Sequence, residues 1–305
     1  MMNTYEILHL ITEKARSIDA PLYAITVIRD GISETAEIRL GNRVNALYSV
    51  TKGFVSTAIG WLCDHGMLST EATVYDLFSD EYPALCTDAW RGCTVGHVLT
   101  QTTGIEHGFL DADFDDVQSF GEDWMIPVLQ HTPVHQPGAH FCYSDSNFYL
   151  LSRMFAKAAG EPIGTFWERE LFRPMHFSLH ASAVCPLGHS PGGTGLFLCC
   201  EDMAKLGQLY LNGGIWNGKR ILSENWCQRA TAMHVRISDT DGYAYGFRKY
   251  TRAPEEEFFV SGAKNQGIHV YPQNNLVIAW QGHDRQNNRL GPLIEYVNTL
   301  GRTPL

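Results

Sequence analysis

The residues most suited to chemistry are Ser49 and Lys52, which are three positions apart where a loop enters an apolar helix. A serine hydroxyl is a weak nucleophile at neutral pH and needs a base and a group that stabilises an oxyanion. Residues three apart lie on the same face of a helix, so the Lys52 side chain is expected beside the Ser49 hydroxyl. The spacing therefore predicts a serine nucleophile with a lysine partner.

A second pair, Ser261 and Lys264, has the same spacing in a different setting. It lies between two strand-like segments, 257–260 and 267–271, and Gly262 disfavours a helix between them. Ser261 and Lys264 are thus not expected to share a helical face. Ser49 is the better candidate, although a serine at this position can also be a simple helix N-cap.

The elements that must position these residues follow from the apolar spacing along the chain. Residues 70–174 have mostly helical spacing. Outside that segment, helices are expected over 4–17, 50–65, 201–212 and 291–300, and strands over 23–28, 36–40, 243–247, 257–260, 268–271 and 276–280.

This order predicts an α+β fold, in which an antiparallel sheet is flanked by N- and C-terminal helices. The sheet lobe is expected to comprise residues 1–66 and 181–305, and a mostly helical second lobe residues 67–180. The two lobes form one catalytic unit, and the cleft between them is the expected place for the site.

The next candidate is the segment Tyr143, Ser144 and Asp145. A phenol loses its proton near pH 10 and is a useful base only where a cation, such as Lys52, stabilises the phenolate. Together with Ser49 and Lys52, this segment resembles the Ser-x-x-Lys and Tyr-x-Asn motifs of class C β-lactamases. The broader group contains penicillin-binding proteins, D-aminopeptidases, carboxylesterases and amide hydrolases.

Three further segments resemble that group in the same order, so the resemblance covers nearly the whole chain. Residues 95–105 are similar to its "LLTHTSGL" segment, with Gln101 in place of the usual His. Residues 192–207 are similar to its "GGL…DLARFG" segment, and residues 260–263 lie where the family has a Lys-Thr-Gly or His-x-Gly strand.

The resemblance implies a β-lactamase/transpeptidase-like fold and hydrolysis through an acyl-serine intermediate, with no cofactor. Ser49 would attack an ester or amide carbonyl, and Lys52 and Tyr143 would relay its proton. The backbone N–H groups of Ser49 and Ala263 would form the oxyanion hole. The expected substrate-binding residues are Gln101, Asp145, Ser261, Gly262 and Lys264.

Two departures from the family pattern bear on the substrate. Asp145 replaces an Asn, and an ionised carboxylate cannot donate the hydrogen bond that an amide gives. Asp145 is expected instead to pair with Lys52 or to hold a substrate amine. Val260 lies where β-lactamases have a Lys, which leaves Lys264 as the nearby cation. Both changes favour a carboxylesterase or a D-amino-acid peptidase or amidase over a true β-lactamase.

Two alternatives stay open at this point. Ser144, Asp145 and Ser146 also resemble the Ser-Asp-Asn element of class A enzymes, which would make Ser144 the base-side residue in place of Tyr143. A catalytically silent relative that binds a ligand or acts as a scaffold is the other alternative, although the intact Ser49, Lys52 and Tyr143 argue against it.

The charge of the chain limits its partners. A formal net charge of −10 over 305 residues argues against nucleic acid and anionic membranes, which favour basic surfaces. The expected partner is a small ester, amide or peptide substrate, and the sequence does not indicate an oligomeric state. The N-terminal segment lacks the features of a signal peptide and the eight cysteines lack a zinc spacing, so a cytoplasmic location with free thiols is expected.

No metal site is expected. The acidic segment 111–122 imitates a calcium loop, but Asp116 stands where the sharp turn of such a loop demands Gly. The histidines between residues 131 and 140 are separated by Pro133 and Pro137, which break any shared helical face. A solvated acidic loop that borders the cleft is the expected structure for residues 108–121.

Overall fold

The computed structural model describes residues 2–284 and 289–304 and begins with helix α1, Thr4–Ser17, as the sequence predicts. Asn3 and Glu6 form a capping box that satisfies the first free N–H groups of the helix. Ile7 and Ile11, four residues apart, are fully buried on one face. That face packs on the sheet, so α1 is held by both its cap and its apolar stripe.

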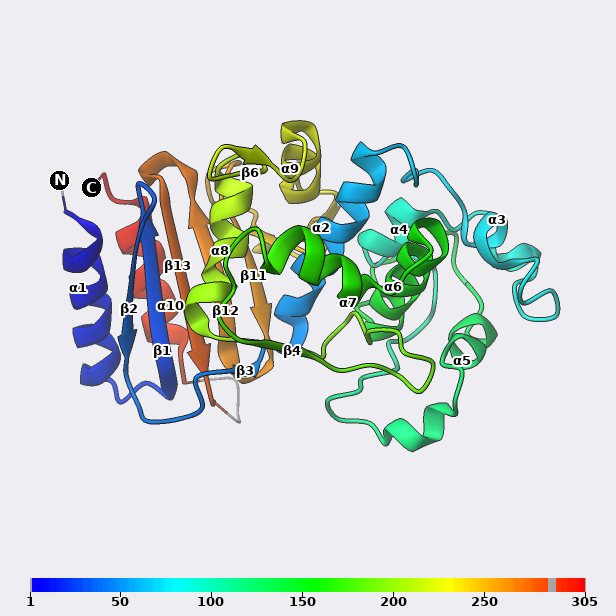
Figure 1. The fold of residues 1–305 in the computed structure, drawn as a ribbon, viewed down its shortest axis with the longest axis horizontal. Helices are drawn as coiled ribbons and strands as arrows, with labels where there is room; N and C mark the ends of the chain where they lie inside the picture. The colour runs from blue at the N-terminus through cyan, green and yellow to red at the C-terminus, as the bar shows by residue number, and fades with distance from the viewer. Residues whose placement is uncertain (1, 285–288, 305) are drawn as a thin grey trace.

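The main sheet has eight antiparallel strands in the order β2-β1-β13-β12-β11-β10-β9-β8 (Figure 1). It joins both ends of the chain, because β1 pairs with β13 in a register that places Ile25 opposite Trp280. The strands are β1 (Leu22–Arg29), β2 (Ile32–Glu37), β8 (Val235–Arg236), β9 (Asp241–Tyr243), β10 (Arg248–Tyr250), β11 (Phe258–Gly262), β12 (Gln266–Tyr271) and β13 (Leu276–Gly282).

Helices cover both faces of this sheet. The terminal helices α1 and α10 (Gly291–Arg302) share one apolar cluster with β1 and β13. Helix α8 (Cys200–Leu211) covers the other face and lies very close to it: a Cβ at Gly207 would be 2.8 Å from both Ile268 and Val277. The predicted α+β fold, a sheet flanked by terminal helices, is confirmed.

The rest of the chain is mainly helical, and most of its helices lie on the side of the molecule away from α1 (Figure 1). Its helices are α3 (Val74–Phe78), α4 (Val95–Leu99), α5 (Met125–Gln130), α6 (Asp145–Ala159), α7 (Ile163–Phe166) and α9 (Glu224–Thr231). Helix α2 (Thr51–Asp64) packs against α6 in the large apolar core that joins these helices to the sheet. Within the described residues, none of the helices is long and apolar enough to cross a membrane.

Two small antiparallel sheets complete the described structure. Strands β3 (Asn45–Ala46), β5 (Leu196–Leu198) and β4 (His180–Ser182) form the first, which connects the segment before Ser49 to the segment after Gly193. Strands β6 (Ile215–Trp216) and β7 (Lys219–Arg220) form the second, a tight hairpin.

Two predicted strands differ from the structure. The strand expected over 36–40 is β2, Ile32–Glu37, because the turn at Asp30 and Gly31 fixes the register and brings this polar segment to the exposed sheet edge. The strand expected over 243–247 is wrong. Residues 244–247 form the turn between β9 and β10, and their apolar side chains face the core from that turn.

Gly246 explains why this turn forms beside the candidate nucleophile. Its φ of 79° is unfavourable for other residues, and a Cβ at this position would be 2.9 Å from the Lys52 carbonyl oxygen. The turn therefore packs directly on the first turn of α2.

Candidate active site

Ser49 lies in a single 3₁₀ turn, η1 (Tyr48–Val50), that leads into α2. The residue before it, Tyr48, has a left-handed φ of 49°. One turn later, the Lys52 ammonium donates a hydrogen bond of 3.0 Å to the Ser49 hydroxyl. The local helical geometry thus brings the serine and the lysine together as their spacing predicts.

Lys52 is almost completely buried, with 1% of its surface exposed. Besides Ser49, its Nζ donates to Asp145 Oδ1 at 2.6 Å and to the Gly193 carbonyl oxygen at 2.8 Å. Burial alone would lower the pKa of Lys52, but the Asp145 carboxylate, with the phenols of Tyr143 and Tyr243, raises it above the ordinary value. The Lys52 side chain is therefore held as an ammonium beside the Ser49 hydroxyl.

Asp145 and Gly193 complete the cradle for this ammonium. Asp145 is the first residue of α6, and Ser144 is the N-cap. A Cβ at Gly193 would lie 2.4 Å from Asp145 Cγ, so only glycine lets the carbonyl reach Lys52 beside the carboxylate. The site thus contains Gly193, which the sequence analysis did not select; its signal was its place in the Gly192–Leu196 segment.

Tyr143 lies on the open side of Lys52. Its side chain is 42% exposed, and the Lys52 Nζ is 4.8 Å from the centre of its ring. The fully buried Tyr243 packs edge-on against Tyr143, with ring centres 6.2 Å apart. Burial first, and Tyr143 second, raise the pKa of Tyr243, so this buried phenol stays neutral and supports the exposed one.

Ser144 has a different environment. Its hydroxyl accepts from Phe109 N, donates to Phe109 O and bonds the Ser146 hydroxyl at 2.6 Å. These contacts tie the 109 loop to the start of α6, and the residue is 2% exposed. The contacts of Ser144 are structural ones, which supports Tyr143 as the base-side residue.

Gln101 holds the start of α6 in place. It is fully buried, and its Oε1 accepts hydrogen bonds from Ser144 N at 3.1 Å and from Asn147 Nδ2 at 2.5 Å. The amide thereby anchors the first turn of α6, which presents Asp145 to Lys52. The contacts of Gln101 suit positioning of the catalytic segment more than direct contact with a substrate.

If Tyr143 is the base-side residue, we expect Tyr143→Phe to lower kcat by about two or more orders of magnitude, because the variant loses the hydroxyl that would transfer protons. Ser144→Ala should change kcat far less and mainly reduce stability by about 1–3 kcal/mol, since it leaves its buried partners unsatisfied. Steady-state kinetics and thermal melts of both variants check this. A Phe variant with near-normal turnover beside an inactive Ser144→Ala variant would reverse the assignment.

The end of β11 packs on the backbone around Ser49. A Cβ at Gly262 would lie 2.5 Å from the Leu47 carbonyl oxygen and 3.1 Å from Ser49 N, so the close approach depends on glycine. Because side chains alternate along a strand, Ser261 points to the other face of the sheet. There it lines a small cavity with Phe259 and His269, so the structure does not bring its side chain to Ser49.

The loop at 111–116 contacts residues on both sides of the candidate site. Asp113 accepts a hydrogen bond of 2.9 Å from Thr194, and the Lys264 ammonium lies 5.5 Å from the centre of the Phe114 ring. Burial first, then Asp145, raises the pKa of Asp113, while Lys52 and Lys264 lower it. Asp113 therefore lies beside the segment that contains Gly193, and Phe114 lies beside Lys264.

Three carboxylates gather here. Oxygen atoms of Asp111, Asp113 and Asp145 lie within 4.8 Å of one another. Burial, followed by Asp145, raises the pKa of Asp111 to about 6. The Lys52 ammonium already bonds Asp145, and Asp111 Oδ1 accepts from the loop's own Asp113 N. These carboxylates therefore make an acidic wall that has a protein cation beside it.

The fold and this arrangement define the class of protein. The Beta-lactamase family model matches residues 41–297, and the chain belongs to that family. A 6-aminohexanoate-dimer hydrolase from Paenarthrobacter ureafaciens is 23% identical over 252 residues, which are 75% of this chain and 61% of that protein. The chain thus spans about three fifths of the length of this curated relative.

Solved structures show the same fold. A Bacillus anthracis protein assigned as a 6-aminohexanoate-dimer hydrolase has a TM-score of 0.79 at 17% identity, over 96% of this chain and 83% of that one. A penicillin-binding protein homologue from Caulobacter crescentus has a TM-score of 0.76 at 16% identity, over 98% of each chain. EstCE1, a hydrolase with promiscuous acyltransferase activity, has 0.72 at 14% identity, over 96% and 98%.

Proposed function

We propose that this protein is a serine hydrolase that cleaves small esters or amides through an acyl-serine intermediate. The observation that carries the proposal is the buried Lys52 ammonium, which bonds Ser49, Asp145 and Gly193 together. A buried charge is costly unless it is paired, so such a group beside an accessible hydroxyl is typical of a catalytic site. No cofactor enters the proposed reaction.

In the acylation step, Ser49 Oγ forms a bond to the carbonyl carbon of the substrate. The Tyr143 hydroxyl accepts the serine proton as it gives its own proton to the leaving alcohol or amine, whose bond to the carbonyl carbon breaks. The Lys52 ammonium stabilises negative charge that develops on Ser49 and Tyr143 during this transfer.

In the deacylation step, a water oxygen forms a bond to the acyl carbon, and a proton of that water passes through Tyr143 to Ser49 Oγ. The bond between Ser49 Oγ and the acyl carbon then breaks, and the acid is released. The backbone N–H groups of Ser49 and Ala263 are proposed to hold the oxyanion in both steps. The close packing of Gly262 on the Ser49 backbone supports this role, because it brings the next residue of the chain to the nucleophile.

The charge around Ser49 favours some substrates over others. The acidic wall of Asp111, Asp113 and Asp145 opposes a β-lactam carboxylate, while Lys264, the nearby cation, lies against Phe114 and lowers the pKa of Asp113. We therefore propose a carboxylesterase, or a peptidase or amidase for D-amino-acid or amine-bearing substrates. The name of the curated relative, a 6-aminohexanoate-dimer hydrolase, supports a hydrolase for amine-bearing substrates.

Substrate charge should rank the rates. We expect kcat/KM to be highest for an amine-bearing ester such as a D-alanyl p-nitrophenyl ester, lower for p-nitrophenyl butyrate, and lowest for the anionic nitrocefin, because unlike charges attract. The preference of amine over butyrate should grow from about pH 5 to about pH 7, because Asp111 loses its proton there while the substrate amine keeps its own.

Asp113→Asn should reduce the same preference by about threefold to tenfold, since it removes one negative charge near the cleft. Asp116→Asn, a change in an exposed residue of the same loop, is the matched control and should leave it unaltered. A nitrocefin rate equal to the ester rate would show that the acidic wall does not select the substrate.

The alternative is a silent relative that binds a ligand without turnover. A fluorophosphonate probe separates the two, because it phosphonylates an activated serine, with loss of fluoride, and leaves an unactivated serine unlabelled. All eight cysteines are free, which supports residence in a reducing compartment such as the cytoplasm.

A further inference from the structure

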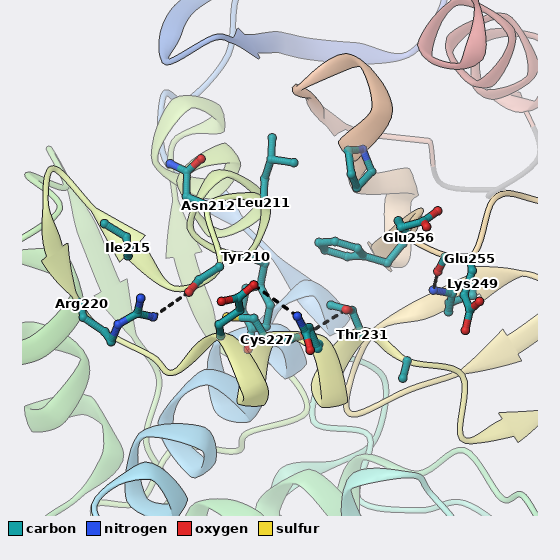
Figure 2. Close-up of a pocket in the computed structure, with 16 residues that line it drawn as sticks. Tyr210, Leu211, Asn212, Ile215, Arg220, Cys227, Thr231, Lys249, Glu255 and Glu256 are labelled. Carbon is teal, nitrogen blue, oxygen red and sulfur yellow. Dashed lines mark hydrogen bonds between the residues drawn. The ribbon is translucent and has the colours of Figure 1, made fainter.

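A cavity of about 530 Å³, shown in Figure 2, is lined by residues other than Ser49 and its partners. It is formed by the C-terminal end of α8, the β6–β7 hairpin, α9 and the segment that joins β10 to β11. It reaches β11 at Phe258, whereas the nucleophile packs at Gly262, about 13 Å further along the strand. The cavity is therefore separate from the catalytic cleft.

The cavity has an apolar wall and a charged rim. Tyr210, Cys227 and Phe258 are buried and provide apolar contact surface. Charged and polar side chains that are exposed surround them at the rim: Arg220, Glu224, Gln228, Glu255 and Glu256. A ligand that fits this cavity needs a compact apolar body.

Lys249 is the unusual member of the lining. Only 3% of its surface is exposed, and among the described residues its ammonium donates one hydrogen bond, to the main-chain carbonyl of Glu255 (Figure 2). An ammonium has three N–H donors, so two lack a partner there. By comparison, the Lys52 ammonium, with 1% of the residue's surface exposed, has three hydrogen-bond partners, one of which is a carboxylate.

This difference points to a missing counter-ion. Buried charges in proteins are paired, because an uncompensated charge in a low-dielectric environment is costly. Burial lowers the pKa of Lys249, and the acidic neighbours Glu255, Glu256 and Glu257 oppose that shift, although none of these described residues forms an ion pair with it. The side chain lines the cavity, so a ligand in the cavity can supply the anion.

We propose that this cavity binds a small monocarboxylate with a short aliphatic or aromatic body, whose carboxylate pairs with Lys249. The body would lie against Tyr210 and Phe258. A single negative charge suits the site. The rim carboxylates repel a dianion more strongly than a monoanion, and the buried ammonium repels cations. This proposal is independent of the hydrolase activity proposed above.

Hexanoate and its uncharged isostere hexanamide test the proposal in calorimetric titrations of the whole protein. We expect hexanoate to bind at least tenfold more tightly than hexanamide. Lys249→Met should lose at least tenfold in hexanoate affinity. Lys219→Met, which changes the exposed lysine of the neighbouring hairpin, should bind as the parent does.

Methionine resembles lysine in shape and removes an underpaired charge, so Lys249→Met should melt no lower than the parent. The comparison of hexanoate with hexanamide needs no variant and tests the same point. Equal binding of the two compounds, or no detectable hexanoate binding, would overturn the proposal. Hexanoate binding that survives Lys249→Met but is lost when a fluorophosphonate occupies Ser49 would place the carboxylate in the catalytic cleft and overturn it as well.

Discussion

Ser49→Ala is expected to abolish both hydrolysis and covalent labelling. Removal of a catalytic nucleophile costs on the order of 10⁴-fold or more in kcat, because no other group can form the acyl intermediate. Ester hydrolysis and intact-mass measurement after fluorophosphonate treatment check the loss of turnover and of the single adduct. The fold should persist, since the Ser49 hydroxyl bonds only Lys52 among the described residues.

The matched control is Ser261→Ala, which changes the serine of the second Ser-x-x-Lys match. Its side chain lines a cavity on the other face of the sheet, so the variant should keep its label and most of its activity. An adduct that survives in Ser49→Ala, or that disappears in Ser261→Ala, would refute the assignment of the nucleophile.

Lys52→Met is the second change with a large expected effect. It should lower kcat by about two to four orders of magnitude, because Ser49 and Tyr143 lose the cation that stabilises their developing charge. It should also reduce stability by about 3–5 kcal/mol, since Asp145, with 8% of its side-chain surface exposed, becomes a buried carboxylate without a cation. Kinetics and denaturant melts measure the two effects separately.

A double variant distinguishes catalysis from stability. Adding Asp145→Asn to Lys52→Met removes the unpaired carboxylate, so most of the lost stability should return while activity stays low. Lys157→Met provides a control for a surface ion pair and should cost less than about 1 kcal/mol. Recovery of turnover in the double variant would show that Lys52 acts only through the structure.

The pH dependence of this ion pair has a definite sign. The pKa of Lys52 is higher in the folded protein than in the unfolded chain. Its stabilising contribution is therefore fully present below the ordinary lysine pKa and is lost as pH rises through the folded value. The parent should keep this contribution throughout the neutral range, and its stability advantage over Lys52→Met should shrink only at strongly alkaline pH.

Local sequence patterns determined much of the fold. The bounds of α1 follow from an apolar stripe and a capping box within the helix itself, and they match the prediction at both ends. The strand expected over 243–247 was wrong, because the structure of this segment depends on remote packing and not on a local signal. Its apolar residues are buried by the packing of a turn on α2, and a short apolar segment does not show whether it is a strand or a turn.

The sequence by itself determined the pair Ser49 and Lys52, because three residues of one helical turn fix their separation. Only the tertiary structure decided what holds the lysine charged: Asp145 is 93 positions from Lys52, and Gly193 is 141. It also brought Asp113 to the cleft and left Lys249 underpaired in a distant cavity. Electrostatic energies depend on distances and burial that arise when remote segments pack, and no local spacing encodes them.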